Sequence, residues 1–284
     1  MAQIIDGKAV AAQVRAGVAL EVAQLKEHGV TPGLAVIVVG DDPASRIYVN
    51  NKKKACAEVG IYSEEHALAA DTSLDELIAL VRALNSRGDI SGILCQLPLP
   101  NGLDDRAVIE NIAPLKDVDA FHPANVGRIM LGDYHFLPCT PAGIMELLHH
   151  YNISAEGKEC VVVGRSNIVG KPMSMLLLHE NGTVTTCHSR TRDLKAVTSR
   201  ADILVAAVGK PKFITGDMVK EGAVVIDVGM DRDENGKLCG DVDFATVEPK
   251  ASYITPVPGG VGPMTIAMLL KNTVTAAKIQ NMIP

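Results

Sequence analysis

Residues 161–172 read Val161-Val-Val-Gly164-Arg-Ser-Asn-Ile-Val-Gly170-Lys-Pro172. The three β-branched residues predict a buried strand that ends at Gly164, and Gly170 opens an apolar helical run. A strand, a glycine turn and a helix start present backbone N–H groups and a positive dipole end, which suits a phosphate group. The spacing is not G-x-G-x-x-G, because Ser166 stands where the second glycine belongs, so an ordinary β–α turn stays the alternative.

The bulk composition narrows the class of protein. The chain has 284 residues, of which 47% are hydrophobic and 3% aromatic, so we expect an aliphatic core. The net charge is −6 without a basic tail, which argues against nucleic-acid binding. Six scattered cysteines form no C-x-x-C pair, so they are expected to be buried thiols in a reducing cytosol, and no metal site is predicted. Neither a signal peptide nor a membrane span is indicated, so we expect a cytoplasmic protein with no membrane partner.

Alternating helical and apolar segments predict an α/β fold with parallel sheets in two lobes. Helices are predicted over 8–28, from Asp42-Pro43 to about 59, over 74–86 with Thr72 or Ser73 as cap, over Met173 to Leu178, and over 265–279. Strands are predicted over 34–39, 92–96, 159–164, 183–187, 203–208 and 224–228, with a last one in 251–258. The region 116–141 is expected to be rich in loops and to join the lobes.

The second predicted strand of the nucleotide-binding unit is not followed by the acidic residue that is typical of an NAD site. An NAD-binding unit carries Asp or Glu there to hold the ribose 2′-OH, but this chain reads Cys187-His-Ser189-Arg190-Thr-Arg192. Ser189, Arg190 and Arg165 can bind a phosphate instead, which favours NADP. Arg190 and Arg192 have the alternative of being a solvated surface pair, and one of the two is expected to be only that.

A lysine in the first lobe is a candidate proton-transfer group. Ser45, Tyr48 and Lys52 lie at i, i+3 and i+7 and therefore share one helix face. Beside a tyrosine at a cleft edge, a desolvated Lys52 can have a lowered pKa. The alternative is a surface lysine. The Tyr-x-x-x-Lys spacing also occurs in short-chain dehydrogenases, but there the nucleotide loop precedes the pair, whereas Gly164 follows it here.

Three further loops carry groups that can contact a ligand. Gln96 leaves the carboxyl end of a predicted parallel strand, and its amide can both donate and accept. Asp119 can accept from paired N–H groups of a heterocycle, with a turn or cap residue as the alternative. The loop at 256–263 holds more proline and glycine than a single turn needs.

Taken in order, these motifs resemble the bifunctional methylenetetrahydrofolate dehydrogenase/cyclohydrolase family over essentially the whole chain. The motifs are Ile5-Asp-Gly-Lys8, Ser45-x-x-Tyr48-x-x-x-Lys52, Gln96-Leu-Pro-Leu-Pro100, Lys116-Asp-Val-Asp119, Cys139-Thr-Pro, Gly164 to Ser174, and Pro256-Val-Pro-Gly-Gly-Val-Gly-Pro-Met-Thr265. The resemblance implies an N-terminal catalytic domain at 1–120 and a Rossmann-like NADP-binding domain at 121–264, with the active-site cleft between them. The helix at about 265–284 is expected to pack back on the first domain.

The resemblance also implies residue roles and partners. Lys52 is the expected proton-transfer residue, Gln96 its hydrogen-bond partner, Tyr48 the neighbour of the p-aminobenzoyl ring and Asp119 the pterin ligand. Pro258, Gly259 and Gly260 are expected to close over the folate. NADP+ is expected at Gly164, Arg165, Ser166, Gly170, Ser189 and Arg190, with Met230 near it. A homodimer through the cofactor domain is expected.

One position departs from the family, and two other functions stay open. The family commonly has glycine after the second aspartate, and Ala120 stands here, which puts the loop and the pterin affinity in doubt if φ is positive. The alternatives are a monofunctional NADP-dependent dehydrogenase and a non-catalytic NADP sensor. Lys52, Tyr48 and Gln96 together argue against the first, and the pairing of Lys52 with Asp119 argues against the second.

Overall fold

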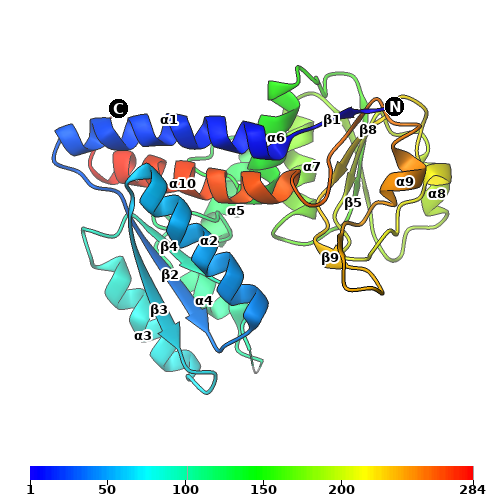
Figure 1. The fold of residues 1–284 in the computed structure, drawn as a ribbon. Helices are drawn as coiled ribbons and strands as arrows, with labels where there is room; N and C mark the ends of the chain where they lie inside the picture. Colours follow the sequence, from blue (N-terminus) through cyan, green and yellow to red (C-terminus); the bar gives the residue numbers. More distant parts are fainter. Residues whose placement is uncertain (101, 284) are drawn as a thin grey trace. The chain divides into compact units, whose positions relative to one another are not determined.

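The computed structural model describes residues 1–100 and 102–283, and its backbone divides into two compact units. One unit comprises Met1–Ala11 and Thr140–Thr265, and the other comprises Ala12–Cys139 and Ile266–Pro284 as far as they are described. The α/β class and the parallel sheets expected from the sequence are confirmed (Figure 1).

The first unit is built on a six-stranded parallel sheet in the order β1-β11-β8-β7-β5-β6. Its strands are β1 (Gln3–Ile4), β5 (Glu159–Val163), β6 (Thr183–Cys187), β7 (Ile203–Ala206), β8 (Val224–Asp227) and β11 (Tyr253–Ile254). Its helices are most of α6 (Cys139–His150), then α7 (Gly170–His179), α8 (Leu194–Thr198), the 3₁₀ turn η1 (Gly216–Met218) and α9 (Phe244–Val247). A small antiparallel hairpin pairs β9 (Asp231–Arg232) with β10 (Leu238–Cys239).

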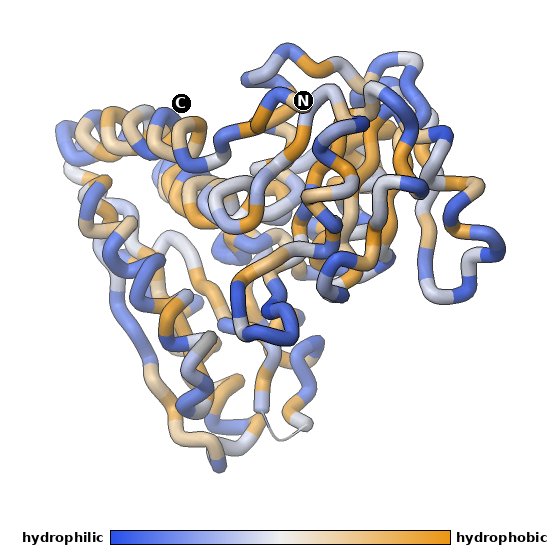
Figure 2. Tube along the Cα trace, turned by 45° about the vertical axis from the view of Figure 1, so that its right-hand side comes forward, coloured by the Kyte–Doolittle hydropathy of each residue, from blue (hydrophilic) through white to orange (hydrophobic). Residues whose placement is uncertain are grey.

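The core of this unit is aliphatic, as the composition predicts. Strands β7 and β8 are buried along their whole length, which is the pattern of a parallel sheet covered on both faces. In Figure 2 the hydrophobic colour gathers in the middle of this unit, and the loops around it are mostly hydrophilic.

The second unit holds a three-stranded parallel sheet in the order β3-β2-β4. The strands are β2 (Gly33–Val39), β3 (Tyr62–Leu68) and β4 (Gly92–Cys95). The helices are most of α1 (Gly7–Glu27) and α10 (Val261–Gln280), with α2 (Pro43–Val59), α3 (Leu74–Asn85), α4 (Asp105–Asn111) and α5 (Pro123–Leu131). All seven residues of β2 are buried, as its continuous apolar run predicts.

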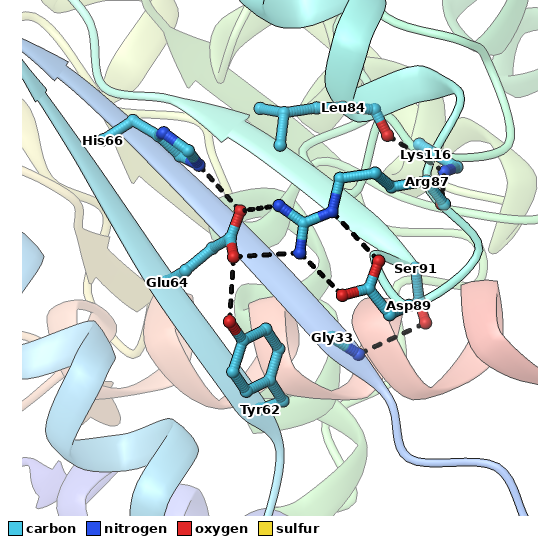
Figure 3. A network of polar contacts seen from close by, with 9 residues as sticks. All are labelled: Gly33, Tyr62, Glu64, His66, Leu84, Arg87, Asp89, Ser91 and Lys116. Carbon is cyan, nitrogen blue, oxygen red and sulfur yellow. Dashed lines mark hydrogen bonds and ion pairs between the residues drawn. The ribbon is translucent and has the colours of Figure 1, made fainter.

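Strand β3 was not predicted, because its side chains are largely polar. Figure 3 shows what holds these groups in place: Glu64 on β3 accepts from Arg87 at 2.6 and 3.1 Å, from Tyr62 at 2.9 Å, and contacts the His66 ring nitrogen at 2.7 Å. Arg87 also donates to Asp89 at 2.6 Å. The edge strand is therefore stabilised by a partly exposed ion-pair network rather than by an apolar pattern.

The unit boundaries differ from the expected division at residue 120. The first 11 residues belong with the six-stranded sheet because β1 pairs with β11, Gln3 opposite Tyr253. Residues 121–139 belong with the three-stranded sheet, and they include a helix, α5, where loops were expected. Pro123 occupies the first turn of that helix and the His122 ring accepts from the N–H of Ala124, so a proline that looked like a loop signal is a helix start.

Candidate active site

Helix α2 presents Lys52 to the interior of the second unit. The helix starts where the Asp42 side chain accepts from the N–H of Ser45 at 2.8 Å, and it ends at Gly60 in the left-handed conformation. Lys52 is only 9% exposed, whereas Lys53 and Lys54 are exposed. Lys52 is therefore not the surface lysine that its spacing left possible.

Lys52 has a neutral hydrogen-bond partner. Its Nζ donates to Oε1 of Gln96 at 2.9 Å, the hydrogen bond that the resemblance implies. Nε2 of Gln96 donates in turn to the carbonyl of Leu97 at 3.0 Å, which fixes the amide so that its oxygen faces the lysine. Gln96 directly follows β4, at the carboxyl end of a parallel strand.

Burial controls the charge of this lysine. Loss of hydration lowers the pKa of Lys52, and the charges of Asp119, Cys139 and Cys56 oppose that shift only in part. Burial raises the pKa of Cys56 to about 11 and that of Cys139 well above its usual value, so both thiols are neutral near pH 7. Of these three groups, Asp119 is therefore the one that supplies negative charge to Lys52.

The loop that carries Asp119 is anchored by its other polar residues. Nζ of Lys116 donates to the carbonyls of Leu84, at 3.2 Å and drawn in Figure 3, and of Arg87, at 2.5 Å. Asp117 is buried, and its Oδ2 accepts from Nδ2 of Asn125 and from the N–H of His122, both at 2.8 Å. Lys116 and Asp117 thus hold the loop, while Asp119 is partly exposed and can meet a ligand.

Asn272 on α10 is a residue of this site that the sequence patterns did not single out. Its buried Nδ2 donates to the carbonyl of Val118 at 2.8 Å and to that of Leu137 at 2.9 Å. It also contacts Sγ of Cys139 at 3.7 Å. One amide therefore fixes the residue before Asp119 and the segment before Cys139, and no sequence motif marks it.

Ala120 has a positive φ, the backbone conformation for which glycine is preferred at this position. Its φ is +57° and its side chain is fully buried. The loop thus keeps a left-handed residue without the glycine that tolerates it best, at a cost of about 1–2 kcal/mol for a residue with a Cβ. The strain lies next to Asp119 rather than in it.

Replacing Ala120 by glycine is expected to stabilise the protein by about 0.5–1 kcal/mol, because relief of the left-handed strain exceeds the extra chain entropy of glycine. Urea unfolding followed by circular dichroism measures the change. The matched control is Ala107→Gly inside α4, which is expected to lose about 1 kcal/mol. A loss of stability in Ala120→Gly would contradict the strain assigned to this residue.

The glycine turn after β5 lies in the first unit and is closely packed. Gly164 has φ +142°, and a Cβ at this position would lie 2.2 Å from the carbonyl oxygen of Ala207. A Cβ at Gly170 would lie 2.3 Å from the carbonyl oxygen of Gly164. Oγ of Ser166 accepts from the N–H groups of Val169 and Gly170 at 3.2 and 3.3 Å, so serine takes part in the turn where a second glycine was missing.

The residues around this turn fit an anionic dinucleotide. Arg165, Ser166, Ser189 and Arg190 are all exposed beside the ends of β5 and β6. Among residues 1–100 and 102–283, no carboxylate forms an ion pair with Arg165 or Arg190. Cations without an acidic partner at a helix start are the donor set that a phosphate-bearing cofactor needs.

The proline-glycine loop belongs to the same unit and packs against the chain start. The N–H of Gly260 donates to the carbonyl of Pro256 at 2.8 Å, and the N–H of Lys8 donates to that of Gly259 at 3.1 Å. Gly259 has φ +110°, and the Val257–Pro258 peptide is cis. Met230, which is 44% exposed, lies against Gly262, where an added Cβ would lie 2.8 Å from the methionine Cε.

The structure therefore brings the expected site residues together in two groups. Lys52, Gln96 and Asp119 interact within the second unit, with Tyr48 on the same helix as Lys52. The glycine turn, the two arginines and the proline-glycine loop belong to the first unit. In the part of the chain that is described, no group of three or more His, Cys, Asp or Glu residues is arranged to hold a metal ion, and no helix has the length and hydropathy of a membrane span.

Two sequence models of one family match this chain in tandem. The catalytic domain of tetrahydrofolate dehydrogenase/cyclohydrolase matches residues 5–119, and the NAD(P)-binding domain of the same enzymes matches residues 138–281. The chain belongs to this family. The tetrahydrofolate dehydrogenase/cyclohydrolase fold thus accounts for both units, one with the lysine site and one with the glycine turn.

Relatives and solved structures support the assignment to the tetrahydrofolate dehydrogenase/cyclohydrolases. The bifunctional protein FolD of Acetivibrio thermocellus is 61% identical over 279 residues, which is 98% of each chain. The FolD crystal structure from Campylobacter jejuni has a TM-score of 0.96 at 50% identity and covers 98% of this chain and 99% of its own. The Trypanosoma brucei enzyme, solved with NADP and an inhibitor, has a TM-score of 0.94 at 40% identity and covers 98% of both chains.

Proposed function

We propose that this chain catalyses two successive reactions: NADP+-dependent oxidation of 5,10-methylenetetrahydrofolate to the methenyl compound, and hydrolysis of that cation to 10-formyltetrahydrofolate. Membership of the tetrahydrofolate dehydrogenase/cyclohydrolase family supports both activities. The single observation that carries the hydrolytic step is the buried Lys52, held by the neutral amide of Gln96 with Asp119 as the charged neighbour.

Lys52 serves as the proton-transfer group of the hydrolysis. Attack of water on the methenyl carbon requires that a proton leave the water, and a lysine with a lowered pKa is the neutral amine that can take it at lower pH than an ordinary lysine. Gln96 orients the amine without adding a charge that would keep it protonated. The same amine can return the proton to a folate ring nitrogen when the five-membered ring opens.

The remaining folate contacts follow from chemistry and position. Asp119 is partly exposed and accepts from the amino and ring N–H groups of the pterin. Tyr48 is 38% exposed on the helix of Lys52 and lies against the p-aminobenzoyl ring. Pro258, Gly259 and Gly260 form the loop that closes over the folate.

The cofactor residues bind and orient NADP+. When bound, NADP+ supplies the hydride acceptor. Gly164, Ser166 and Gly170 would hold the pyrophosphate at the turn and at the start of α7, and Met230 would lie near the nicotinamide end. Ser189, Arg190 and Arg165 bind the 2′-phosphate, and the lack of an acid at the end of β6 favours NADP+ over NAD+.

The chain is also proposed to form a homodimer through the cofactor unit. Strand β6 is the last strand in the sheet order, so its outer edge has no partner strand among the described residues. Such an edge needs cover or pairing. Light scattering after size-exclusion chromatography tests the proposal, and a mass near 30.0 kDa at working concentration would contradict it.

The rate of hydrolysis is expected to rise with pH and then to level off. The midpoint of the rise is expected to lie below 10.5, the ordinary pKa of a lysine. Because the pKa of Lys52 is lowered, the neutral amine that accepts a proton appears at lower pH than in an ordinary lysine. The pH–rate profile with saturating methenyl substrate, corrected for the uncatalysed reaction, checks this. A rate that falls as pH rises toward the midpoint would contradict the role of a neutral Lys52.

One assay tests the whole proposal. Absorbance is followed at the reduced nicotinamide and methenyl bands after 5,10-methylenetetrahydrofolate is mixed with NADP+ or NAD+. Reduced cofactor without lasting methenyl signal, and faster with NADP+, is the expected result. Accumulation of the methenyl compound would instead establish a monofunctional dehydrogenase, and no signal with either cofactor would overturn the proposal.

A further inference from the structure

The loop that follows β7 is held by a buried carboxylate. Oδ2 of Asp241 accepts from the N–H of Val208 at 2.6 Å, and Oδ1 accepts from the N–H of Lys210 at 2.7 Å. Asp241 is 0% exposed. A carboxylate can remain in such surroundings only if its oxygens are satisfied, and here two backbone donors from one loop satisfy them.

A second carboxylate fixes the first. Oδ1 of Asp227, the last residue of β8, accepts from the N–H of Asp241 at 2.9 Å and from that of Gly229 at 3.0 Å. Its Oδ2 accepts from the N–H of Val242 at 3.0 Å. The end of β8, the segment after β10 and the loop after β7 are therefore joined through two buried acids.

Two glycines allow these carboxylates to approach the backbone. A Cβ at Gly240 would lie 2.0 Å from Oδ2 of Asp227, and a Cβ at Gly229 would lie 2.4 Å from the backbone nitrogen of Asp241. Neither position has room for any other residue. The arrangement is therefore closely packed, rather than a loose surface cluster of acids.

Asp231 adds a third acid group to the arrangement. Burial and the charge of Asp241 raise the pKa of Asp231, and its buried Oδ2 accepts no hydrogen bond in the described structure. The side-chain contact with Asp241 raises the pKa of Asp231 further, so Asp241 faces a third acid as well as the two loop N–H groups.

The loop after β7 lies where a dinucleotide is expected. The order β8-β7-β5-β6 places β6 and β7 on opposite sides of β5, and ligands of such sheets bind beyond the carboxyl ends of the strands at this switch point. The Ala207 carbonyl packs against Gly164, the glycine of the phosphate-binding turn. Asp241 thus fixes the loop that lies beside the turn, although it is itself shielded from ligand.

We propose that Asp241 is a positioning residue for the dinucleotide: its carboxylate holds Val208 and Lys210 so that the loop after β7 is already arranged for the cofactor before binding. This inference rests on the proposed use of NADP+ at the turn of Gly164. In this arrangement Asp227 fixes Asp241, and neither acid contacts the cofactor.

The test is Asp241→Asn, with Asp243→Asn as the matched control. An asparagine offers one acceptor oxygen, so its NH2 group opposes one of the two loop donors. The Kd of NADPH, from its fluorescence on titration, and the KM of NADP+ are expected to rise about tenfold or more, which corresponds to about 1.4 kcal/mol. The rate of hydrolysis of the methenyl substrate without nucleotide is expected to stay within about twofold of that of the unaltered protein, because this step needs no cofactor.

The control variant, Asp243→Asn, is expected to leave the Kd of NADPH unchanged. Asp243 is in the same segment, but it accepts from the Thr246 hydroxyl and not from the loop after β7.

An unchanged Kd in folded Asp241→Asn would overturn the inference, as would an equal fall in both activities together with the melting temperature. If the variant does not fold, hydrogen exchange in the unaltered protein decides. The Val208 and Lys210 amides are expected to be protected about 100-fold or more before NADP+ is added, and rapid exchange would overturn the inference. Absence of NADP+-dependent activity in the unaltered protein would instead overturn the proposed function.

Discussion

Lys52→Met is expected to lower the cyclohydrolase rate by about a thousandfold or more, whereas the dehydrogenase is expected to be impaired less. Proton transfer by a positioned side chain contributes about 10²–10⁴-fold, and the proposed hydrolysis uses Lys52 for this transfer. Hydride transfer depends chiefly on the orientation of two bound molecules, which a methionine of similar length preserves better. Separate assays of the two steps, each started from its own folate substrate, measure the difference.

The free energy of unfolding of Lys52→Met is not expected to fall with its activity. The folded state lowers the pKa of Lys52 below 10.5, so it favours the neutral amine. Its contribution to stability is therefore present above pH 10.5 and is lost as pH falls through the folded pKa, so the burial of Lys52 costs stability at pH 7. Methionine removes that cost, and urea unfolding is expected to show a variant at least as stable as the unaltered protein.

Lys53→Met is the matched control, because Lys53 is the adjacent lysine on the same helix and is exposed. It is expected to leave both activities and the stability nearly unchanged. Equal retention of both activities in Lys52→Met would refute the role of this lysine, and a marked loss of stability would mean that the variant measures folding rather than proton transfer.

Gly164→Ala is expected to abolish measurable NADP+ binding and to lower the free energy of unfolding by about 3 kcal/mol, because backbone strain and overpacking each cost about 1–3 kcal/mol. The alanine would have to adopt φ +142°, and its Cβ would lie 2.2 Å from the Ala207 carbonyl oxygen. Relief requires β5 and the loop after β7 to separate, which opens the glycine turn that is proposed to bind the cofactor. Calorimetric titration with NADP+ and urea unfolding measure the two effects.

Gly157→Ala separates the close approach from the loss of a glycine as such. Gly157 is in the same unit and has φ +68°, but no atom lies within 4 Å of an added Cβ. This variant is expected to lose about 1 kcal/mol and to keep its affinity for NADP+. Similar losses of stability in the two alanine variants would show that the contact with Ala207 has no consequence of its own.

The apolar patterns in the sequence predicted most of the buried framework. Strands such as β2 and β5 consist of continuous apolar residues because both faces are covered, and that pattern can be recognised from sequence. Helix caps could also be predicted, since Asp42 and Ser73 both accept from the first-turn N–H groups as their positions suggest. Ser73, not Thr72, forms the capping box with Glu76.

Elements held together by polar contacts could not be predicted in the same way. Strand β3 shows no apolar alternation, because Glu64 is satisfied by Arg87 and Glu65 by Arg46, and both arginines lie outside the strand. Asn272 and Asp241 were not predicted for the same reason, since their contacts are polar and long-range. Each side chain bonds backbone groups that are far away in the sequence and come close only in the folded chain. Lys52 and Gln96 were recognisable through motifs, but the burial of Lys52 was not.

The way the backbone passes between the two units bears on how the chain can be divided by protein engineering. The N-terminal strand β1 completes the sheet of one unit, whereas α10 near the other end supplies Asn272 and Gln280, whose amides hold backbone carbonyls of the other. No single cleavage point therefore yields two complete pieces. A fragment ending at residue 139 keeps Lys52 and Asp119 but lacks α10, and its complement keeps the glycine turn but lacks β1. A division of the chain at residue 139 therefore leaves each chemical step on an incomplete unit.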